Sequence, residues 1–307
     1  MAFLEGPSIK QIEMIKQELG EGPDDLERGV RDLRSMCAAN PYLPNADALE
    51  TQLLQVFLRG CRMDFERARK KLETFCYARS RFRDLYEHRS ITEPPLNEVC
   101  KFLDIIPLPK LTDEGLRVTI FRVRPNYPES ASDISAAVRA ILLISDVRMH
   151  DETLIAGDVF IWEASHVRAS IAARVAASAS SVRRSIQLAQ AAYPQRMRRI
   201  HVVGAPSLVA SSLNLMRSCV NEKIRKRYYL HSKTEELFDH FPARVLPAEW
   251  GGEEESIEIL NKKWRRRVDE VRDYLRDLSE VCNVCPDSHY DNDIYGVVGS
   301  FRKLDID

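Results

Sequence analysis

Basic residues gather in two segments where they could bind phosphate. The first segment, just before a strand-like run, holds Arg196, Arg198 and Arg199. The second follows a short apolar segment and holds Lys223, Arg225, Lys226 and Arg227. An arginine side chain can hold a phosphate through two parallel hydrogen bonds, whereas a lysine acts as a point charge. Such segments are equally typical of a solvated surface, so both interpretations are open on the residues alone.

Patterns typical of catalysis are scarce. The sequence contains no GxSxG, P-loop, GxGxxG or HExxH pattern. Cys282 and Cys285 form a lone CxxC near the C-terminus, without a second pair to complete a zinc site. Asp151, Glu152 and Asp158 could pair as carboxylates, but nothing around them distinguishes an acid from a base. We therefore expect no catalytic residue, no metal ion and no cofactor, and we do not expect an enzyme.

The composition is that of a globular chain. Of 307 residues 44% are hydrophobic, and 45 Lys and Arg residues balance 46 Asp and Glu residues, so no bulk attraction to nucleic acid is expected. The densest basic run, residues 262–267, is explained by helical pairing such as Glu258 with Lys262. The N-terminus has no secretory signal, and no apolar run is long enough to cross a membrane. Seven scattered cysteines favour reduced thiols in the cytosol.

Local patterns divide the chain into a helical part and an alternating part. Residues 1–94 show apolar spacing typical of amphipathic helices. After the paired prolines Pro94 and Pro95, apolar and β-branched runs predict strands at 116–124, 155–163, 199–204 and 227–231. Helical patterns lie between them at 134–147, 171–192 and 208–216, and a charged helix follows at 256–278.

This alternation predicts an α/β fold with βαβ units and a mostly parallel sheet covered by helices. We expect a helical N-terminal domain at residues 1–94, an α/β domain at 95–275 and a tail at 276–307.

Apolar side chains on these elements could fill a core or line a cavity. They are Phe121, Ile141, Ile144, Phe160, Trp162, Leu188, Tyr193, Ile200, Leu208, Val209, Leu213 and Met216. On periodicity alone such stripes are ordinary core. Asp158 stands on the same strand face as Phe160 and Trp162, where an apolar residue is the usual choice. We expect its carboxylate to accept a hydrogen bond from a ligand hydroxyl.

Four motifs recur here in one known order. They are Val-Phe-Leu-Arg-Gly-Cys-Arg at 56–62, Tyr-Pro at 193–194, Arg-Ile-His at 199–201 and Leu-Pro-Ala-Glu-Trp-Gly-Gly at 246–252. Together they resemble the CRAL-TRIO family of intracellular lipid-carrying proteins, over roughly residues 20–275. The resemblance implies a helical N-terminal domain followed by an α/β domain with a dry cavity. A mobile gate helix, matched by residues 207–219, would cover that cavity.

The resemblance also assigns roles to residues named above. The apolar set and Asp158 would line the ligand cavity. Arg196, Arg198, Lys223 and Arg227 match family positions that bind phosphoinositide head groups. The chain departs from the family pattern at residues 163–166, at the start of the following helix and at Gly204-Ala205, where an asparagine is usual. These departures are expected to reshape the cavity wall and the gate hinge.

The expected function is that of a monomeric, cytoplasmic carrier that touches phosphoinositide-containing membranes peripherally. Its ligand would be a retinoid, tocopherol, carotenoid or other isoprenoid-like lipid. One alternative is a phospholipid or phosphatidylinositol exchange protein of the same fold, which requires a phosphate-binding cluster inside the cavity. Another is a regulatory interaction module with a collapsed pocket.

Overall fold

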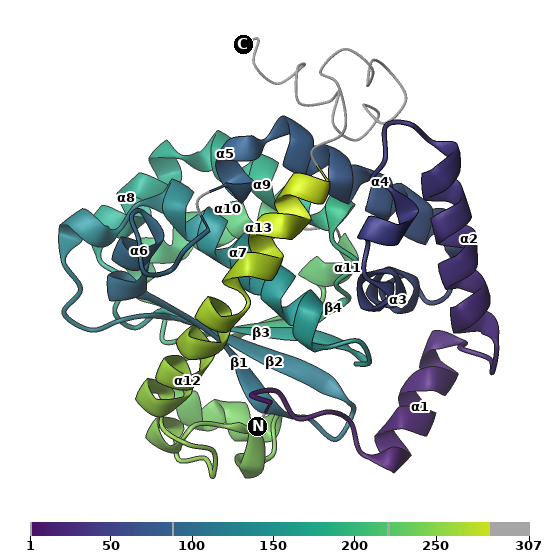
Figure 1. The fold of residues 1–307 in the computed structure, drawn as a ribbon. Helices are drawn as coiled ribbons and strands as arrows, with labels where there is room; N and C mark the ends of the chain where they lie inside the picture. Colours follow the sequence, from purple (N-terminus) through teal and green to yellow (C-terminus); the bar gives the residue numbers. More distant parts are fainter. Residues whose placement is uncertain (1, 88, 220–221, 283–307) are drawn as a thin grey trace.

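A five-stranded sheet forms the centre of the molecule, whose computed structural model describes residues 2–87, 89–219 and 222–282 (Figure 1). In chain order and in space the strands are β1 (Leu103–Leu111), β2 (Leu116–Val123), β3 (Gly157–Glu163), β4 (Met197–Val203) and β5 (Tyr228–His231). β1 pairs antiparallel with β2, and all later pairs are parallel. The predicted α/β class with a mostly parallel sheet is confirmed, as are the four predicted strands.

The edge strand β1 is not predicted from the sequence, because Pro107 and Pro109 interrupt its pattern. Proline has no backbone N–H and is tolerated in a sheet only at an edge or a bulge. β1 has a neighbour on one side only, and its register with β2 shifts between Pro107 and Leu111. The prolines therefore fit an edge position that alternation alone does not reveal.

Helices connect the parallel strands and cover one face of the sheet (Figure 1). They are α7 (Ile134–Asp151) after β2, α8 (Ala169–Ala177) and α9 (Ala179–Ala192) after β3, and α10 (Ala210–Cys219) and α11 (Glu222–Arg225) after β4. The single helix predicted at 171–192 is interrupted at Ser178, which separates α8 from α9. Serine side chains compete for helical backbone groups, and this run is rich in serine.

The opposite face of the sheet is covered by α12 (Ile257–Glu270) and by short turns. Asn261 on α12 donates a hydrogen bond of 2.6 Å to Asp104 on β1. The turns are η4 (Thr234–Asp239), η5 (Ala243–Val245) and η6 (Ala248–Trp250). After η6, Gly251 has a φ of 86°, and a side chain at Gly252 would overlap the carbonyl of Leu246, so both glycines serve a tight return of the chain.

The charged helix predicted at 256–278 consists of two helices, α12 and α13 (Arg272–Val281), separated at Val271. The basic run at 262–267 lies within α12 as expected, but the pairing of Glu258 with Lys262 is wrong. Glu258 instead accepts a hydrogen bond of 2.8 Å from Arg124, a partner distant in sequence. Spacing within the helix cannot predict the pair of Glu258 with Arg124, because the two residues are far apart in the sequence.

The N-terminal helices divide between two places. The helices α2 (Asp25–Ala39), α3 (Thr51–Gly60) and α4 (Phe65–Arg81) share one hydrophobic cluster with side chains of α7 and α9. In contrast, α1 (Ile9–Leu19) buries Ile15 and Leu19 in the core around the sheet. The remaining elements are η1 (Ala46–Ala48), α5 (Arg83–Tyr86), α6 (Leu96–Phe102), η2 (Glu129–Ala131) and η3 (Ser207–Val209).

The predicted boundary at residue 94 falls between α5 and α6 and stays a prediction. Cys285 and the rest of the tail beyond residue 282 lie outside the described residues. Within the described ranges, no helix has both the length and the apolar character needed to cross a membrane.

Candidate functional site

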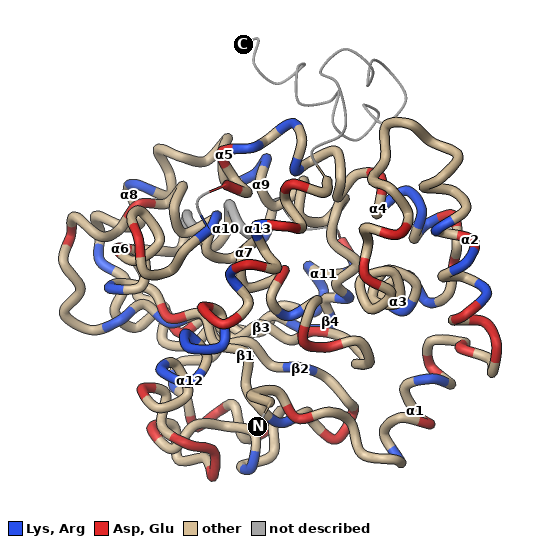
Figure 2. Tube along the Cα trace, in the orientation of Figure 1, with Lys and Arg blue, Asp and Glu red and all other residues tan. Residues whose placement is uncertain are grey.

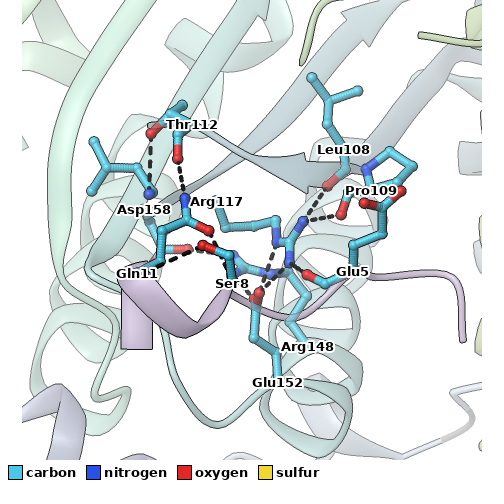
Figure 3. A network of polar contacts seen from close by, with 11 residues as sticks. Glu5, Ser8, Gln11, Leu108, Pro109, Thr112, Arg117, Arg148, Glu152 and Asp158 are labelled. Carbon is cyan, nitrogen blue, oxygen red and sulfur yellow. Dashed lines mark hydrogen bonds and ion pairs between the residues drawn. The ribbon is translucent and has the colours of Figure 1, made fainter. Parts of the chain in front are cut away.

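A buried ion-pair network stands where β2 and β3 begin (Figure 3). Arg117 on β2 donates to Glu152, just after α7, at 2.7 Å. Glu152 also pairs with Arg148 of α7 at 2.6 Å, and Arg148 pairs with Asp158 on β3. Arg117 also donates hydrogen bonds to the backbone carbonyls of Leu108, Pro109 and Glu5. The network therefore ties α7 and the N-terminal segment to the sheet.

Asp158 belongs to this network rather than to an apolar surface. Its side chain is 1% exposed, and its carboxylate accepts from Arg148. Desolvation by burial raises the pKa of Asp158 and outweighs the opposing effect of Arg148. A ligand hydroxyl is not needed as its hydrogen-bond partner, because Arg148 already fills that role. We therefore do not expect Asp158 to contact a ligand.

A small cleft of about 50 Å³ lies beside the network, with Arg59, Gly60, Arg148 and Arg196 in its wall. At its rim two of the sequence motifs meet, because the end of α3 packs directly on Pro194. A side chain at Gly60 would overlap the carbonyl oxygen of Pro194, so glycine is required for this approach. The volume suits a few water molecules and is far too small for a lipid.

The predicted basic residues at the start of β4 are paired with an acidic residue of α1. Arg196 and Arg198 each donate to the same oxygen of Glu18, both at 2.6 Å. Desolvation alone would raise the pKa of Glu18, but Arg198 and Arg196 outweigh it and hold that pKa below its usual range. Nearby, Arg59 makes two hydrogen bonds to Glu21, at 2.7 and 2.8 Å. The sequence pattern gives no sign of these partners.

The second predicted basic segment lies next to the first (Figure 2). The N–H of Ile200 on β4 donates to the carbonyl of Arg227 at 3.0 Å, so the segment around α11 adjoins β4. Lys223 and Arg227 line an open surface depression with Glu222 and Lys226. Among the described residues, neither Lys223 nor Arg227 forms an ion pair. The two segments expected to bind anions therefore come together. In the first, Arg196 and Arg198 pair with Glu18 of α1, and in the second, Lys226 pairs with Glu222 at 3.0 Å.

Most of the predicted apolar lining gathers between the sheet and the helices. The ring of Phe121 stacks on Trp162 at 4.2 Å between centroids and meets Phe160 edge-on at 4.9 Å. Ile141 and Ile144 of α7 belong to the same cluster. Leu213 of α10 and Trp162 pack against a neighbouring cluster that contains Ile200. Val209, in η3, is also buried.

Two predicted lining residues lie elsewhere. Leu188 of α9 and Tyr193, which directly follows α9, belong to the hydrophobic cluster of α2, α3 and α4. The ring of Tyr193 meets that of Phe75 at 5.6 Å. This placement differs from the prediction, because periodicity identifies an apolar face of a helix but not the element that the face packs against. The side chains of Leu208 and Met216 lie outside what the structure describes.

The two faces of β3 differ in how well they are covered. Val159 and Ile161, on the α12 side, are 0% exposed. Phe160 and Trp162 alternate with them along the strand and point to the other face, and both are only half-buried. A central strand of a parallel sheet is normally buried on both faces. Phe160 and Trp162 are therefore the less completely covered apolar side chains of β3.

Comparison with known proteins covers this same region. Residues 103–252, from the first residue of β1 to Gly252, match the family model of the CRAL/TRIO domain. Clavesin-2 of Rattus norvegicus is 26% identical over 251 residues, which are 80% of this chain and 75% of that protein. Alpha-tocopherol transfer protein-like of Mus musculus is 26% identical over 244 residues, 77% of this chain and 68% of that one. The crystal structure of Sfh5 aligns over 84% of this chain and 93% of its own, with a TM-score of 0.48 and 11% identity.

Proposed function

Because residues 103–252 belong to the CRAL/TRIO family, we propose that this protein binds one hydrophobic molecule and exchanges it at membranes. The half-buried Phe160 and Trp162, beside fully buried Val159 and Ile161, are the observation that carries the proposal. A retinoid, tocopherol, carotenoid or similar isoprenoid lipid would cover these rings. Each Å² of apolar surface removed from water contributes about 25 cal/mol to binding. No bond is made or broken in this exchange.

The helix α10 would act as the cover of the ligand site. It contacts the sheet through Leu213, which packs against the cluster of Ala164, Ile200 and Val202. A ligand between α10 and β3 would replace part of this contact with its own apolar surface. Entry and exit then require α10 to move away from the sheet, which we expect to occur at a membrane.

A phospholipid carrier is the second candidate, and the charges on this face argue against it. A phosphate held inside the site needs a cation that is not already paired. Arg117 and Arg148 lie at the lower end of the face, but both are committed to Glu152 and Asp158. A neutral ligand needs no unpaired cation in the site. A collapsed regulatory module would instead leave Phe160 and Trp162 fully covered.

We further propose that the basic residues beside α1 and α11 dock the protein, from the cytosol, on phosphoinositide-containing membranes. Arg196, Arg198, Lys223 and Arg227 would contact the phosphates. Glu18 already occupies Arg196 and Arg198, so a membrane phosphate must displace it. Arg196 and Arg198 can therefore bind a membrane phosphate only when Glu18, at the end of α1, moves away from them.

Replacing Arg196 and Arg198 together by alanine is expected to weaken binding to vesicles that contain phosphatidylinositol bisphosphate. A basic residue near an anionic surface contributes about 1 kcal/mol, so the loss should be about 10- to 30-fold. Co-sedimentation measures it. The control for net charge is the double variant Arg31→Ala with Arg183→Ala, which also removes two arginines, both exposed. Equal binding by the double variant and the wild type would overturn the docking proposal.

Replacing Glu18 by glutamine should have the opposite effect. The substitution keeps the shape of the side chain but frees the charge of Arg196 and Arg198, so binding to the same vesicles should rise by about 3- to 10-fold. Glu13→Gln removes one exposed charge from the same helix and serves as the matched control. If both variants bind alike, Glu18 does not restrain the arginines.

A further inference from the structure

A cluster of three histidines lies on the α12 side of the sheet, away from the proposed lipid site. His201 on β4 and His231 on β5 point to the same face, because His201 pairs with Tyr229 and His231 with Val203 in register. His240 follows η4 and meets the ring of His201 edge-on, at 4.9 Å between centroids. One nitrogen from each ring lies within 4.8 Å of the other two.

The three imidazoles converge with their nitrogen atoms rather than only with their ring faces. The Nδ1 of His201 and the Nε2 of His231 are 2.9 Å apart. His201 is 0% exposed and His231 is 9% exposed. The Nε2 of His201 is buried without any hydrogen-bond partner, which ordinary core packing leaves unexplained. The cluster thus combines buried nitrogen donors with an unsatisfied polar atom.

A carboxylate beside the cluster orients one of the three rings. The carboxylate of Glu236 lies 3.6 Å from Nδ1 of His231. That contact favours the proton on Nδ1 and leaves the Nε2 lone pair directed at the cluster. Carboxylates commonly orient metal-bound histidines in this way.

We infer that His201, His231 and His240 form a binding site for a divalent transition metal, with Zn²⁺ as the best fit. Three imidazoles suit zinc, copper or nickel, and zinc accepts three histidines with water as a fourth ligand. Zinc–nitrogen bonds of about 2.0–2.1 Å require nitrogens about 3.3 Å apart in a tetrahedral site. The present spacing, from 2.9 to at most 4.8 Å, needs only small rotations of the rings.

The ion would join the interior strand β4 to two segments that follow it in the chain. The strand β5 is a four-residue edge strand, and η4 follows it along the surface. Both come directly after α10 and α11 in the chain. A metal at the histidines would fix β5 and η4 to β4 and so anchor the end of the segment that carries α10. This inference does not depend on the proposed lipid or membrane binding.

Calorimetric titration of the full-length chain, without a histidine tag and after chelator treatment, tests the site with Zn²⁺ alone. One ion per chain is expected, and Co²⁺ should give the intense visible absorption of a tetrahedral complex. His240→Ala should weaken binding by about 100-fold or more, since loss of even an outer partner costs about 10- to 100-fold. Glu236→Gln should weaken it by about 10-fold.

His166→Ala, which changes an exposed histidine, is the matched control and should bind as the wild type does. His240 is only partly buried, so its alanine variant should fold, and circular dichroism without metal checks this. A wild-type chain that binds no stoichiometric Zn²⁺ would overturn the inference. So would a folded His240→Ala variant with unchanged affinity, which would leave the cluster as a hydrogen-bonded stack.

Discussion

Replacing Asp146 by asparagine is expected to lower the free energy of unfolding by about 3–5 kcal/mol. Asp146 lies on α7 and is completely buried between Arg79 of α4 and Arg89. Arg79 donates to it at 2.6 Å and also stands over the ring of Phe75. Removing the carboxylate charge leaves two buried guanidinium groups without a counter-ion. The pair joins α4 to α7, so the loss should affect the whole fold.

Chemical denaturation at neutral pH measures this effect. Asp47→Asn is the control, because the Asp47 side chain is 94% exposed and its ion pair with Arg34 spans 3.9 Å. Exposed pairs contribute little, so the control should unfold with the wild type. If the Asp146 variant has the same free energy of unfolding as the wild type, the buried ion pairs of Asp146 do not stabilise the fold.

The difference between wild type and Asp146→Asn should shrink in acid. Desolvation raises the pKa of Asp146, but Arg79 and then Arg89 outweigh it, so the folded-state pKa lies below the ordinary value. A lowered carboxyl pKa contributes stability that is present above the unfolded pKa, about 3.9, and is lost as pH falls through the folded value. Unfolding curves at pH 7 and near pH 3 test this sign.

Replacing Leu213 by aspartate is expected to abolish binding of apolar ligands while leaving vesicle binding intact. Leu213 is the described side chain of α10 that packs against Ile200 and its neighbours. A carboxylate at this position would face the apolar wall without a partner, which costs several kcal/mol. That cost corresponds to about 100-fold or more in affinity. Uptake of retinol and of alpha-tocopherol, each offered in excess, provides the measurement.

The neighbouring substitution Asn214→Asp provides the matched control. Asn214 is exposed on the same helix, so its carboxylate would face water and ligand uptake should persist. Circular dichroism confirms that both variants keep their helices. Uptake that is equal in Leu213→Asp and in the control would show that α10 does not cover the ligand.

Much of the fold was predictable because burial leaves a local pattern. The β-branched runs around Val118 and Val202 identify buried parallel strands, and the paired prolines mark the change to alternating elements. The edge strand β1 was not predicted, because its prolines interrupt the pattern that is typical of a strand. The break at Ser178 also escaped, because a run of alanine and serine keeps its helical appearance on both sides.

The site was less predictable because it depends on contacts between distant residues. Glu18 meets Arg196 across 178 positions, and no local spacing links them. Leu188 and Phe160 are both apolar and regularly spaced, yet Leu188 packs in the cluster of the N-terminal helices and Phe160 packs against the core around the sheet. Asp158 resembled a ligand contact only because its partner, Arg148, belongs to a different element. Sequence alone identifies candidate site residues, but which of them are in contact depends on the fold.

Native mass spectrometry of the purified full-length chain, followed by organic extraction, tests the central claim most directly. We predict one neutral, isoprenoid-like molecule bound per chain, identified in the extract and absent from Leu213→Asp. A co-purified phospholipid would replace the proposed ligand with the exchange alternative. A chain that is empty and takes up no lipid from a mixed extract would contradict the carrier account.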